Sequence, residues 1–326
     1  MKSSLLPALR SLALLLPVLA CGCSLPEPKQ GAETGKTTGI DILTVGPGQA
    51  YALPSEAANA SKAGDTIRIF PGIYADCATW KQDGLVVEGA GPGVTITGKT
   101  CDDKGLFIVK GSNVTIRNLT LTGAKADSHN GSGIRAEGAN LTVEDSRFID
   151  DEDGILAGDN AASTIIIRNS YFKGNGNCIA ACAHGIYANR IARLRVEHSE
   201  FVAQHVGHHI KSRAAVTQIT DNLIQDGPDG STSYLVDLPN GGSAHISGNR
   251  FEKGPNSQNK RTAIAIRAEK DKVPNPDGEI VIENNSFSND TGSVTAFVRN
   301  FAAVPVVVRN NRFEGPVTPY AGASDE

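Results

Sequence analysis

The sequence predicts an all-β solenoid, in which short coils of strand and turn stack on one another. Eight copies of one phrase recur between residues 114 and 313, each a β-branched strand followed, in most copies, by Asn or Ser and then by a large apolar residue. A repeat of this length built from strands and turns indicates a solenoid, because no single unit can bury its apolar side alone. The residues that close the copies are 23 to 36 positions apart and are Leu121, Phe148, Phe172, Phe201, Ile224, Phe251, Phe287 and Phe313.

Composition agrees with this fold class. The chain has 35 Gly and 16 Pro in 326 residues but one Met and one Trp, a profile rich in turns and poor in material for long helices. The net charge of −4 is small and the Lys and Arg residues are not clustered, so nucleic acid is not an expected partner. We expect one solenoid domain over residues 41–318 that acts as a monomer.

The N-terminus has the pattern of an export signal over residues 1–21. Lys2 and Arg10 precede a short apolar run, residues 12–20, which is too short to span a membrane. The run ends in VLAC and places Cys21 where a bacterial lipoprotein signal has its acylated cysteine, with Cys23 as a rival acceptor. We expect a lipid anchor in the outer membrane as the only membrane contact. Simple secretion, to the periplasm or beyond, is the alternative.

The signal precedes a polar segment, residues 22–40, that is rich in Pro, Gly and Lys and is typical of a flexible linker. Residues 54–63 then predict a short amphipathic helix that covers the open edge of the first coil, since exposed sheet edges invite association. After Phe313 the chain becomes rich in proline, which predicts the end of strand addition and a disordered tail over residues 319–326.

Export permits disulfides, and four further cysteines allow three connectivities. Cys77 and Cys101 are 24 residues apart, the length of one coil, and Cys178 and Cys182 can close a small loop. A zinc site with nearby His184 is the alternative, but structural bridges are the expectation.

Two columns of the repeat are assigned to the interior. The aromatic and aliphatic closing residues are expected to stack in the core rather than to bind sugars. The polar column two residues earlier is expected to form an internal hydrogen-bonded ladder. Its members are Ser146, Ser170, Ser199, Asn222, Asn249, Asn285 and Asn311.

A second strand in each coil carries the candidate site. Inward residues such as Ile186 and Ile210 alternate with outward residues, so neighbouring coils place several titratable side chains on one outer face. The candidate catalytic residues are His184, Tyr187, His208, Lys211, Arg213 and Asp237, and the candidate substrate-binding residues are Arg135, Asn189, His209 and Arg267. No metal site is assigned, and the acidic run at residues 150–153 is expected to be a solvated turn rather than a calcium site.

This residue set suits an acidic polysaccharide. Cations can neutralise a uronate carboxylate, a lysine crowded by other cations loses its proton more readily and can act as base, and Tyr or His can return a proton. The result is β-elimination, or epimerisation at C5 if the proton returns on the opposite face. Glycoside hydrolysis needs two facing carboxylates, and the strands offer mainly Asp237. A protein that only binds the polymer is the remaining alternative.

Residues 41–315 resemble the right-handed parallel β-helix superfamily of pectate-lyase-like proteins. Within them, HHIKSRAAVTQITDNLI followed by SYLVDLPNGGSAHISGNRF is similar to the coil pair of the chondroitinase B and alginate lyase family, which implies Lys211 as the base. The chain departs from that family where Asp237 or Leu238 replaces an Arg. It also has Gln204 and Val206 at the positions of acidic calcium ligands, so no cofactor is required and calcium is not supported near Lys211. HGIY, HHIKSRA and SYLVDLPNGG are equally similar to exported bacterial β-helix proteins that imply no activity.

Overall fold

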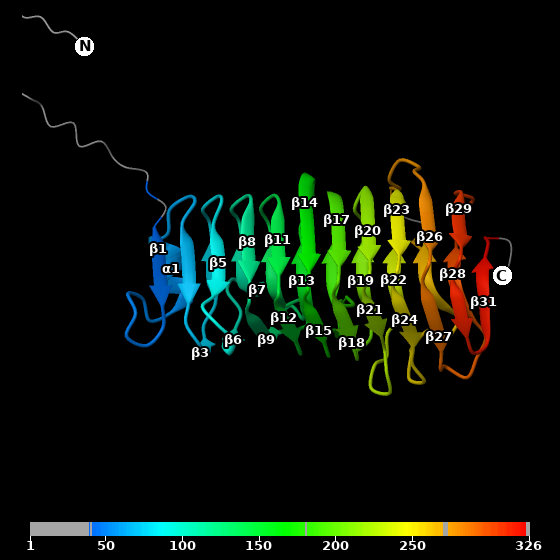
Figure 1. Cartoon of the computed structure of the whole chain (residues 1–326), viewed down its shortest axis with the longest axis horizontal. Helices are drawn as coiled ribbons and strands as arrows, with labels where there is room; N and C mark the ends of the chain where they lie inside the picture. The colour runs from blue at the N-terminus through cyan, green and yellow to red at the C-terminus, as the bar shows by residue number, and fades with distance from the viewer. Residues whose placement is uncertain (1–38, 40, 180, 270–272, 324–326) are drawn as a thin grey trace, which may run out of the picture. The chain divides into compact units, whose positions relative to one another are not determined.

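The computed structural model describes residues 39, 41–179, 181–269 and 273–323, and the solenoid lies in the compact unit formed by residues 40–326. Within the described residues, three parallel sheets of eleven, ten and ten strands run along the stack (Figure 1). Consecutive strands of a sheet come from consecutive coils, so each coil hydrogen-bonds to the coil before it and the coil after it. The predicted β-solenoid is confirmed.

The strands of each sheet follow the chain order. The first sheet contains β1 (Ile42–Val45), β2 (Thr66–Ile69), β5 (Val86–Gly89), β8 (Val114–Arg117), β11 (Leu141–Glu144), β14 (Asn160–Arg168), β17 (Ile191–Glu197), β20 (Val216–Thr220), β23 (Ser243–Ser247), β26 (Ile280–Glu283) and β29 (Val306–Arg309). The second contains β3 (Gly72–Ala75), β6 (Val94–Lys99), β9 (Thr120–Lys125), β12 (Arg147–Ile149), β15 (Tyr171–Lys173), β18 (Glu200–Val202), β21 (Leu223–Gln225), β24 (Arg250–Lys253), β27 (Ser286–Asn289) and β30 (Arg312–Glu314). The third contains β4 (Ala78–Trp80), β7 (Gly105–Val109), β10 (Ser132–Ala136), β13 (Asp153–Ala157), β16 (Ile186–Ala188), β19 (His208–Ser212), β22 (Tyr234–Leu238), β25 (Thr262–Ile266), β28 (Thr295–Asn300) and β31 (Val317–Ala321).

The repeated phrase folds into two strands rather than one, which gives three strands in a full coil. A single residue with positive φ bends the chain inside the phrase, as at Asn118 (φ 56°), Asn169 (φ 51°) and Asn310 (φ 55°). Asn and Asp tolerate this left-handed conformation better than other side chains, which explains their recurrence at the bend. The sequence pattern identified the extended segment, but its division into two strands depends on the φ angle of this one residue.

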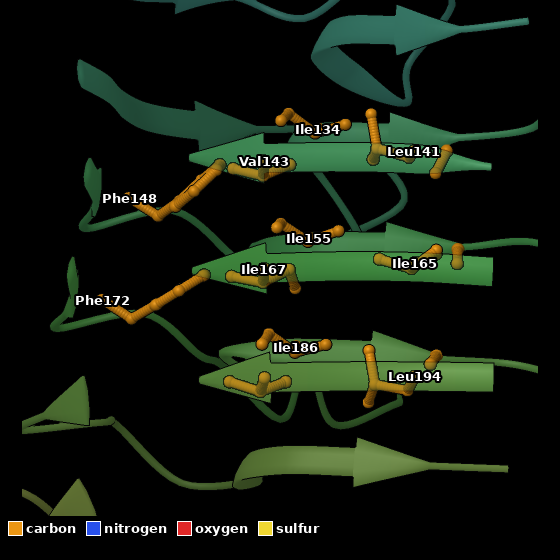
Figure 2. Packing of buried hydrophobic residues seen from close by; sticks show 14 of the residues in the cluster. Ile134, Leu141, Val143, Phe148, Ile155, Ile165, Ile167, Phe172, Ile186 and Leu194 are labelled. Atoms are coloured by element: carbon orange, nitrogen blue, oxygen red, sulfur yellow. The ribbon is translucent and has the colours of Figure 1, made fainter. Parts of the chain in front are cut away.

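The closing column is the core of the solenoid. Register places Leu121, Phe148, Phe172 and Phe201 directly opposite one another on neighbouring coils. The Phe148, Phe172 and Phe201 rings stack with centroids 4.7 and 4.5 Å apart. Figure 2 shows Phe148 and Phe172 at the edge of an aliphatic core that repeats from coil to coil. The assignment of this column to the interior is confirmed.

The polar ladder beside this column is also confirmed. The backbone N–H of each ladder residue donates to the side-chain oxygen of the ladder residue on the next coil, from Ser146 to Ser170 and onward to Asn311. The Asn side chains additionally donate to backbone carbonyls at the bend, as Asn249 does to Ile219 and Ser247. These bonds satisfy backbone groups that the turn buries, and an unsatisfied buried group would be costly.

The two ends of the solenoid differ in how well the sequence anticipated them. The helix α1 (Pro54–Ala60) packs against β1, β2 and β4 and ends three residues earlier than predicted. At the other end, β31 extends to Ala321, past the boundary expected at residue 318. Because β31 is the edge strand of the third sheet, Pro319 leaves no ladder hydrogen bond unmade, and proline is tolerated there.

Both expected disulfides are present among the described cysteines. Cys77 bonds to Cys101, and Cys178 bonds to Cys182. The signal segment, Cys21 and most of the linker lie outside the described residues. No helix in the described part of the chain is long and apolar enough to span a bilayer.

We predict that Phe172→Ala lowers the free energy of unfolding by about 3 to 5 kcal/mol, because it removes the middle ring of a buried stack and leaves a cavity. Equilibrium urea denaturation measures the change. Lys173→Ala, one residue away and exposed, is the control and should change the value by less than about 0.5 kcal/mol. Equal effects of the two substitutions would contradict the assigned core.

Candidate functional site

The predicted outer face exists as a row of side chains on the third sheet. Register aligns Leu156, Tyr187, Lys211 and Asp237 on consecutive coils, with Arg135 one coil before Leu156. Neighbouring members of this row are therefore about 4.8 Å apart along the stack. The stacking of coils thus brings Tyr187, Lys211 and Asp237 together although they span 51 residues of sequence.

These residues form part of a compact charged cluster, which we define as Tyr187, Lys211, Arg213, Asp237 and Glu269. Lys211 Nζ lies 2.6 Å from Glu269 Oε1 and 3.6 Å from Asp237 Oδ2. Arg213 Nη2 lies 2.6 Å from Glu269 Oε2, and Arg213 Nε donates to Tyr187 Oη at 2.9 Å. Both cations have Glu269 as their closest partner, one at each carboxylate oxygen, and within the described residues Arg213 and Asp237 form no ion pair with each other.

Glu269 is the site residue that sequence reasoning missed. It lies in the segment between β25 and β26, where the interval between closing residues lengthens to 36. That long interval was the available signal of an insertion, but it did not reveal where the insertion packs. Asn275 determines the packing, since its amide donates to the carbonyls of Ala214 and Gly241.

Asn240 is a second missed residue, and it holds both the cluster and the insertion. Its Oδ1 accepts a 2.6 Å hydrogen bond from Arg213 Nη1, and its Nδ2 donates to the carbonyl of Val273 at 2.7 Å. Arg213 is thereby fixed by Tyr187, Asn240 and Glu269 at three different nitrogens. A guanidinium held in this way presents a rigid face to an anion.

The two carboxyl groups of the cluster have opposite electrostatic environments. Burial raises the pKa of Asp237 to about 7, which outweighs the opposing effect of Lys211. Asp237 is 2 % exposed, and its Oδ1 has no hydrogen-bond partner within the described residues. Burial also acts to raise the pKa of Glu269, but hydrogen bonds from Lys211 and Arg213 outweigh it and hold that pKa below its ordinary value. Near neutral pH, Glu269 is therefore ionised, whereas Asp237 is present in both its protonated and its ionised form.

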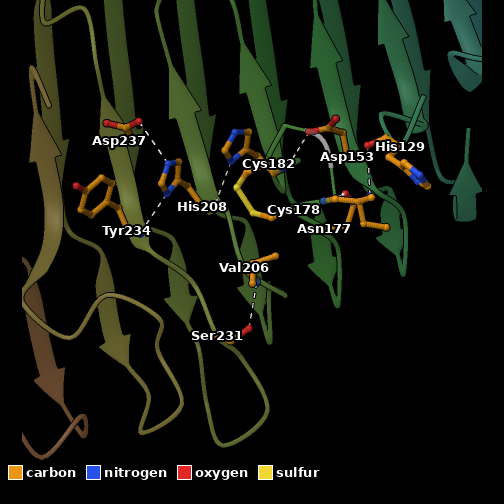
Figure 3. Close-up of a disulfide and its surroundings, with 12 residues drawn as sticks. His129, Asp153, Asn177, Cys178, Cys182, Val206, His208, Ser231, Tyr234 and Asp237 are labelled. Carbon is orange, nitrogen blue, oxygen red and sulfur yellow. Dashed lines mark hydrogen bonds and ion pairs between the residues drawn. A yellow bond between two sulfur atoms is a disulfide. The ribbon is translucent and has the colours of Figure 1, made fainter. Parts of the chain in front are cut away.

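His184 and His208 belong to a second ladder along the edge of this face. The N–H of His184 donates to Asp153 Oδ1, that of His208 to His184 Nδ1, and that of Tyr234 to His208 Nδ1. The rings of His184, His208 and Tyr234 stack with centroids about 5 Å apart. Figure 3 shows His208 beside Tyr234 and Asp237, with a dashed line to each. Asp153, His184 and His208 thus occupy equivalent positions on consecutive coils.

The ladder also determines the charge of the two histidines. Burial lowers the pKa of His184 well below its ordinary value and that of His208 to about 3, with Lys211 adding to both shifts. Because each Nδ1 accepts a backbone hydrogen bond, the proton of each neutral ring is on Nε2. Neither ring is a cation at neutral pH, so neither can neutralise a substrate carboxylate.

Comparisons with known proteins agree with this geometry at the level of the fold. The family described as "Right handed beta helix region" matches residues 73–184. The ORF18 protein of Geobacillus virus E2 aligns over 82 % of this chain and 56 % of its own, with 13 % identity and a TM-score of 0.52. The family match over residues 73–184 and this structural likeness agree with the parallel β-helix fold that the three sheets show.

Other solved structures are similar at lower scores. A pectin methylesterase from Erwinia chrysanthemi aligns over 85 % of this chain and 94 % of its own, with 12 % identity and a TM-score of 0.47. An alginate lyase from a Paenibacillus species aligns over 85 % and 99 %, with 15 % identity and a TM-score of 0.47. Comparison with curated proteins yields no match.

One predicted site residue of the β-helix lies on the wrong side of the sheet. His209 is 1 % exposed and its Nε2 contacts Asp226 Oδ1 at 3.1 Å inside the coil, so its placement on the outer face is wrong. Its position corresponds to Gly154 on an earlier coil, where an added Cβ would lie 2.9 Å from the Phe172 ring. Two consecutive residues of the strand face the core here, which breaks the alternation on which the expectation depended.

The remaining predicted substrate-binding residues lie outside the charged cluster. Asn189 donates to the carbonyl of Ala157, and Arg267 pairs with Asp277 at the base of the insertion. Arg135 is on the same outer row as Tyr187 but two coils away. These three residues remain candidates for contacts with a longer ligand.

The sequence predicted that the acidic run at residues 150–153 is a solvated turn. That prediction is wrong for three of the four residues. Asp151, Glu152 and Asp153 are buried because each carboxylate accepts backbone N–H groups, from Ala124, from Ala126 and Gly131, and from His184. Among the described residues, no three His, Cys, Asp or Glu side chains are placed to share a metal ion. The calcium ligation of the chondroitinase B family does not fit this site, where Asp237 and Glu269 are already paired with Lys211.

We predict that the His208 imidazole does not titrate between pH 5 and 8 in the folded protein and keeps its proton on Nε2. Burial and the hydrogen bond from Tyr234 to Nδ1 both oppose protonation. Nitrogen-15 NMR of the His side chains measures the tautomer and the titration. In the urea-unfolded protein the same residue should titrate at about pH 6.5.

We predict that Asp237→Asn stabilises the protein increasingly as pH rises from about 4 to 7. Folded wild-type protein keeps the Asp237 proton up to about pH 7, whereas the unfolded chain loses it near 3.8, so the folded state binds more protons in this window. Wild-type stability contributed by this group is therefore present at low pH and lost as pH rises. Urea denaturation of both proteins across this range measures the difference, and a pH-independent difference would contradict the buried, proton-holding Asp237.

Proposed function

We propose that this β-helix protein is an enzyme that acts on a uronate-containing polysaccharide, by β-elimination or, as a variant of the same chemistry, by C5 epimerisation. The observation that carries the proposal is the way Lys211 and Arg213 hold a carboxylate, with one 2.6 Å contact to each of its oxygens. Charge-assisted hydrogen bonds to a carboxylate are about twice as strong as neutral ones, and two of them, one at each oxygen, fix its orientation. A buried acid, Asp237, lies beside this site.

Each step of elimination has a residue in position. With a uronate carboxylate against Arg213, negative charge that develops on abstraction of the C5 proton is stabilised by a guanidinium that Tyr187 and Asn240 hold in place. Lys211 acts as base once its ammonium proton has passed to the ionised form of Asp237, whose Oδ2 lies 3.6 Å from Nζ. The C5–H bond breaks, its proton moves to the Lys211 amine, and a C4–C5 double bond forms as the C4–O bond breaks.

Tyr187 supplies the last proton. Its oxygen accepts the hydrogen bond from Arg213 Nε, which leaves its own O–H proton available for the leaving oxygen. If the C4–O bond stays intact and the C5 carbanion receives this proton from the opposite face, the product is the C5 epimer. The two outcomes use the same residues and differ in where the Tyr187 proton goes.

Glycoside hydrolysis is a second candidate, and Glu269 is the specific observation that favours it. Asp237 and Glu269 both contact Lys211 Nζ, so their nearest oxygens are no more than about 6 Å apart. Glycosidases use a protonated carboxyl and an ionised carboxylate at about 5 to 9.5 Å. The divergent pKa values of Asp237 and Glu269 match those two roles.

We place the protein outside the cytoplasm, at the bacterial cell envelope, through a lipid on Cys21. Two disulfides support an oxidising compartment, since such bonds rarely persist in the cytoplasm. Metabolic labelling with a fatty-acid analogue, in the wild type and in Cys21→Ala, tests the anchor directly.

We predict that Lys211→Ala lowers turnover of the preferred polyuronate by at least about 100-fold, because it removes both the base and half of the carboxylate contact. Purified protein is incubated with a panel of uronate polymers while ultraviolet absorbance reports unsaturated product and deuterium exchange reports C5 epimerisation. Lys173→Ala, on the second sheet, is the matched control and should retain full activity.

Other outcomes of this assay separate the candidates. New reducing ends without ultraviolet absorbance or C5 exchange would indicate hydrolysis. Binding that Lys211→Ala weakens, with no product of any kind, would indicate a protein that only binds the polymer.

A further inference from the structure

We propose that Glu269 is an internal ligand that occupies the substrate-carboxylate position, so that a polyuronate binds by displacing its side chain. The inference rests on the proposed function and adds how the same site is regulated. Within the cluster, Glu269 does what a bound uronate would do: Oε1 meets Lys211 and Oε2 meets Arg213. The carboxylate bridges two cations that lie two residues apart at the end of β19 rather than pairing with a single partner.

Relative burial shows which member of the cluster covers the others. The Lys211 and Arg213 side chains are 12 % and 9 % exposed, whereas the Glu269 side chain is 30 % exposed. Glu269 therefore lies on the solvent side of both cations. An external carboxylate cannot reach both Lys211 Nζ and Arg213 Nη2 while Glu269 remains between them and solvent.

The Glu269 side chain can move without releasing the insertion that carries it. Contacts that do not involve Glu269 hold the described residues on either side of it. They are the hydrogen bonds of Asn275 with the carbonyls of Ala214 and Gly241, the bond from Asn240 to Val273, and the Arg267–Asp277 pair. Displacement then needs rotation of one partly exposed side chain and no movement of the backbone. The cations exchange one carboxylate for another, and the charge balance of the site is preserved.

An internal competitor of this kind selects for a polymer. A group tethered to its own site acts at an effective concentration of order millimolar, so a single free uronic acid has to exceed that concentration to displace it. A polyuronate offers many carboxylates and further contacts along the outer row, where Arg135 lies two coils from Tyr187. The substrate class that the site admits is therefore an extended acidic chain rather than a free sugar acid.

Glu269→Ala tests the inference, with Glu279→Ala as matched control. Glu279 is an exposed glutamate of the same insertion whose side chain forms no hydrogen bond or ion pair in the part of the chain that the structure describes. The first readout needs no sugar: the rate at which an amine-reactive reagent labels Lys211, followed by peptide mass spectrometry. The second is the affinity for an oligouronate and its protection of Lys211 from labelling. Thermal unfolding confirms that both variants remain folded.

We expect Glu269→Ala to raise Lys211 labelling by at least about fivefold and oligouronate affinity by at least about tenfold, with Glu279→Ala matching the wild type. Unchanged labelling and affinity in Glu269→Ala, with oligouronate bound by the wild type, would overturn the internal-ligand role and leave the proposed function standing. Raised labelling without binding of or protection by any oligouronate would overturn the proposed substrate instead. Loss of affinity in Glu269→Ala would overturn the inference by showing that Glu269 contacts the substrate.

Discussion

Hydrogen bonding between successive coils is the constraint on which the rest of the structure depends. Each strand satisfies its backbone groups with the strand before it and the strand after it, so residues with the same register become neighbours about 4.8 Å apart. A side chain at a given position of one coil therefore contacts the side chain at the equivalent position of the next coil. The Phe stack, the Ser and Asn ladder and the Asp153–His184–His208–Tyr234 ladder all follow from this register.

The same register concentrates charge where water is largely excluded. Stacking places Lys211 against Asp237, and the insertion after β25 adds Glu269 above them. Isolated burial of any one of these groups would be strongly unfavourable, and their mutual contacts offset that cost. Burial still prevails at Asp237, whose pKa rises to about 7, while direct hydrogen bonds prevail at Glu269. The difference in charge state between two neighbouring carboxyls thus has a geometric origin.

Local pattern predicted the parts of the structure that register governs, and failed where longer-range packing decides. Periodicity was sufficient for the solenoid, the closing column and the row of Tyr187, Lys211 and Asp237. It misplaced His209 because two consecutive residues of β19, His209 and Ile210, face the core, which breaks the alternation of the strand. Glu269 could not be placed from sequence, because its position depends on hydrogen bonds of Asn275 with residues more than 30 positions away.

Charge balance explains why the cluster requires a carboxylate in every state. Lys211 and Arg213 supply two positive charges, and Asp237 offsets one of them only when it is ionised. Without Glu269, two largely buried cations would face a single half-ionised acid, a state that low polarity makes unfavourable. Either Glu269 or an external carboxylate must therefore occupy the position between Lys211 and Arg213. Because leaving this position empty is unfavourable, a ligand binds only by competing with the Glu269 carboxylate. A ligand that makes additional contacts along the same outer row competes more effectively than a single carboxylate.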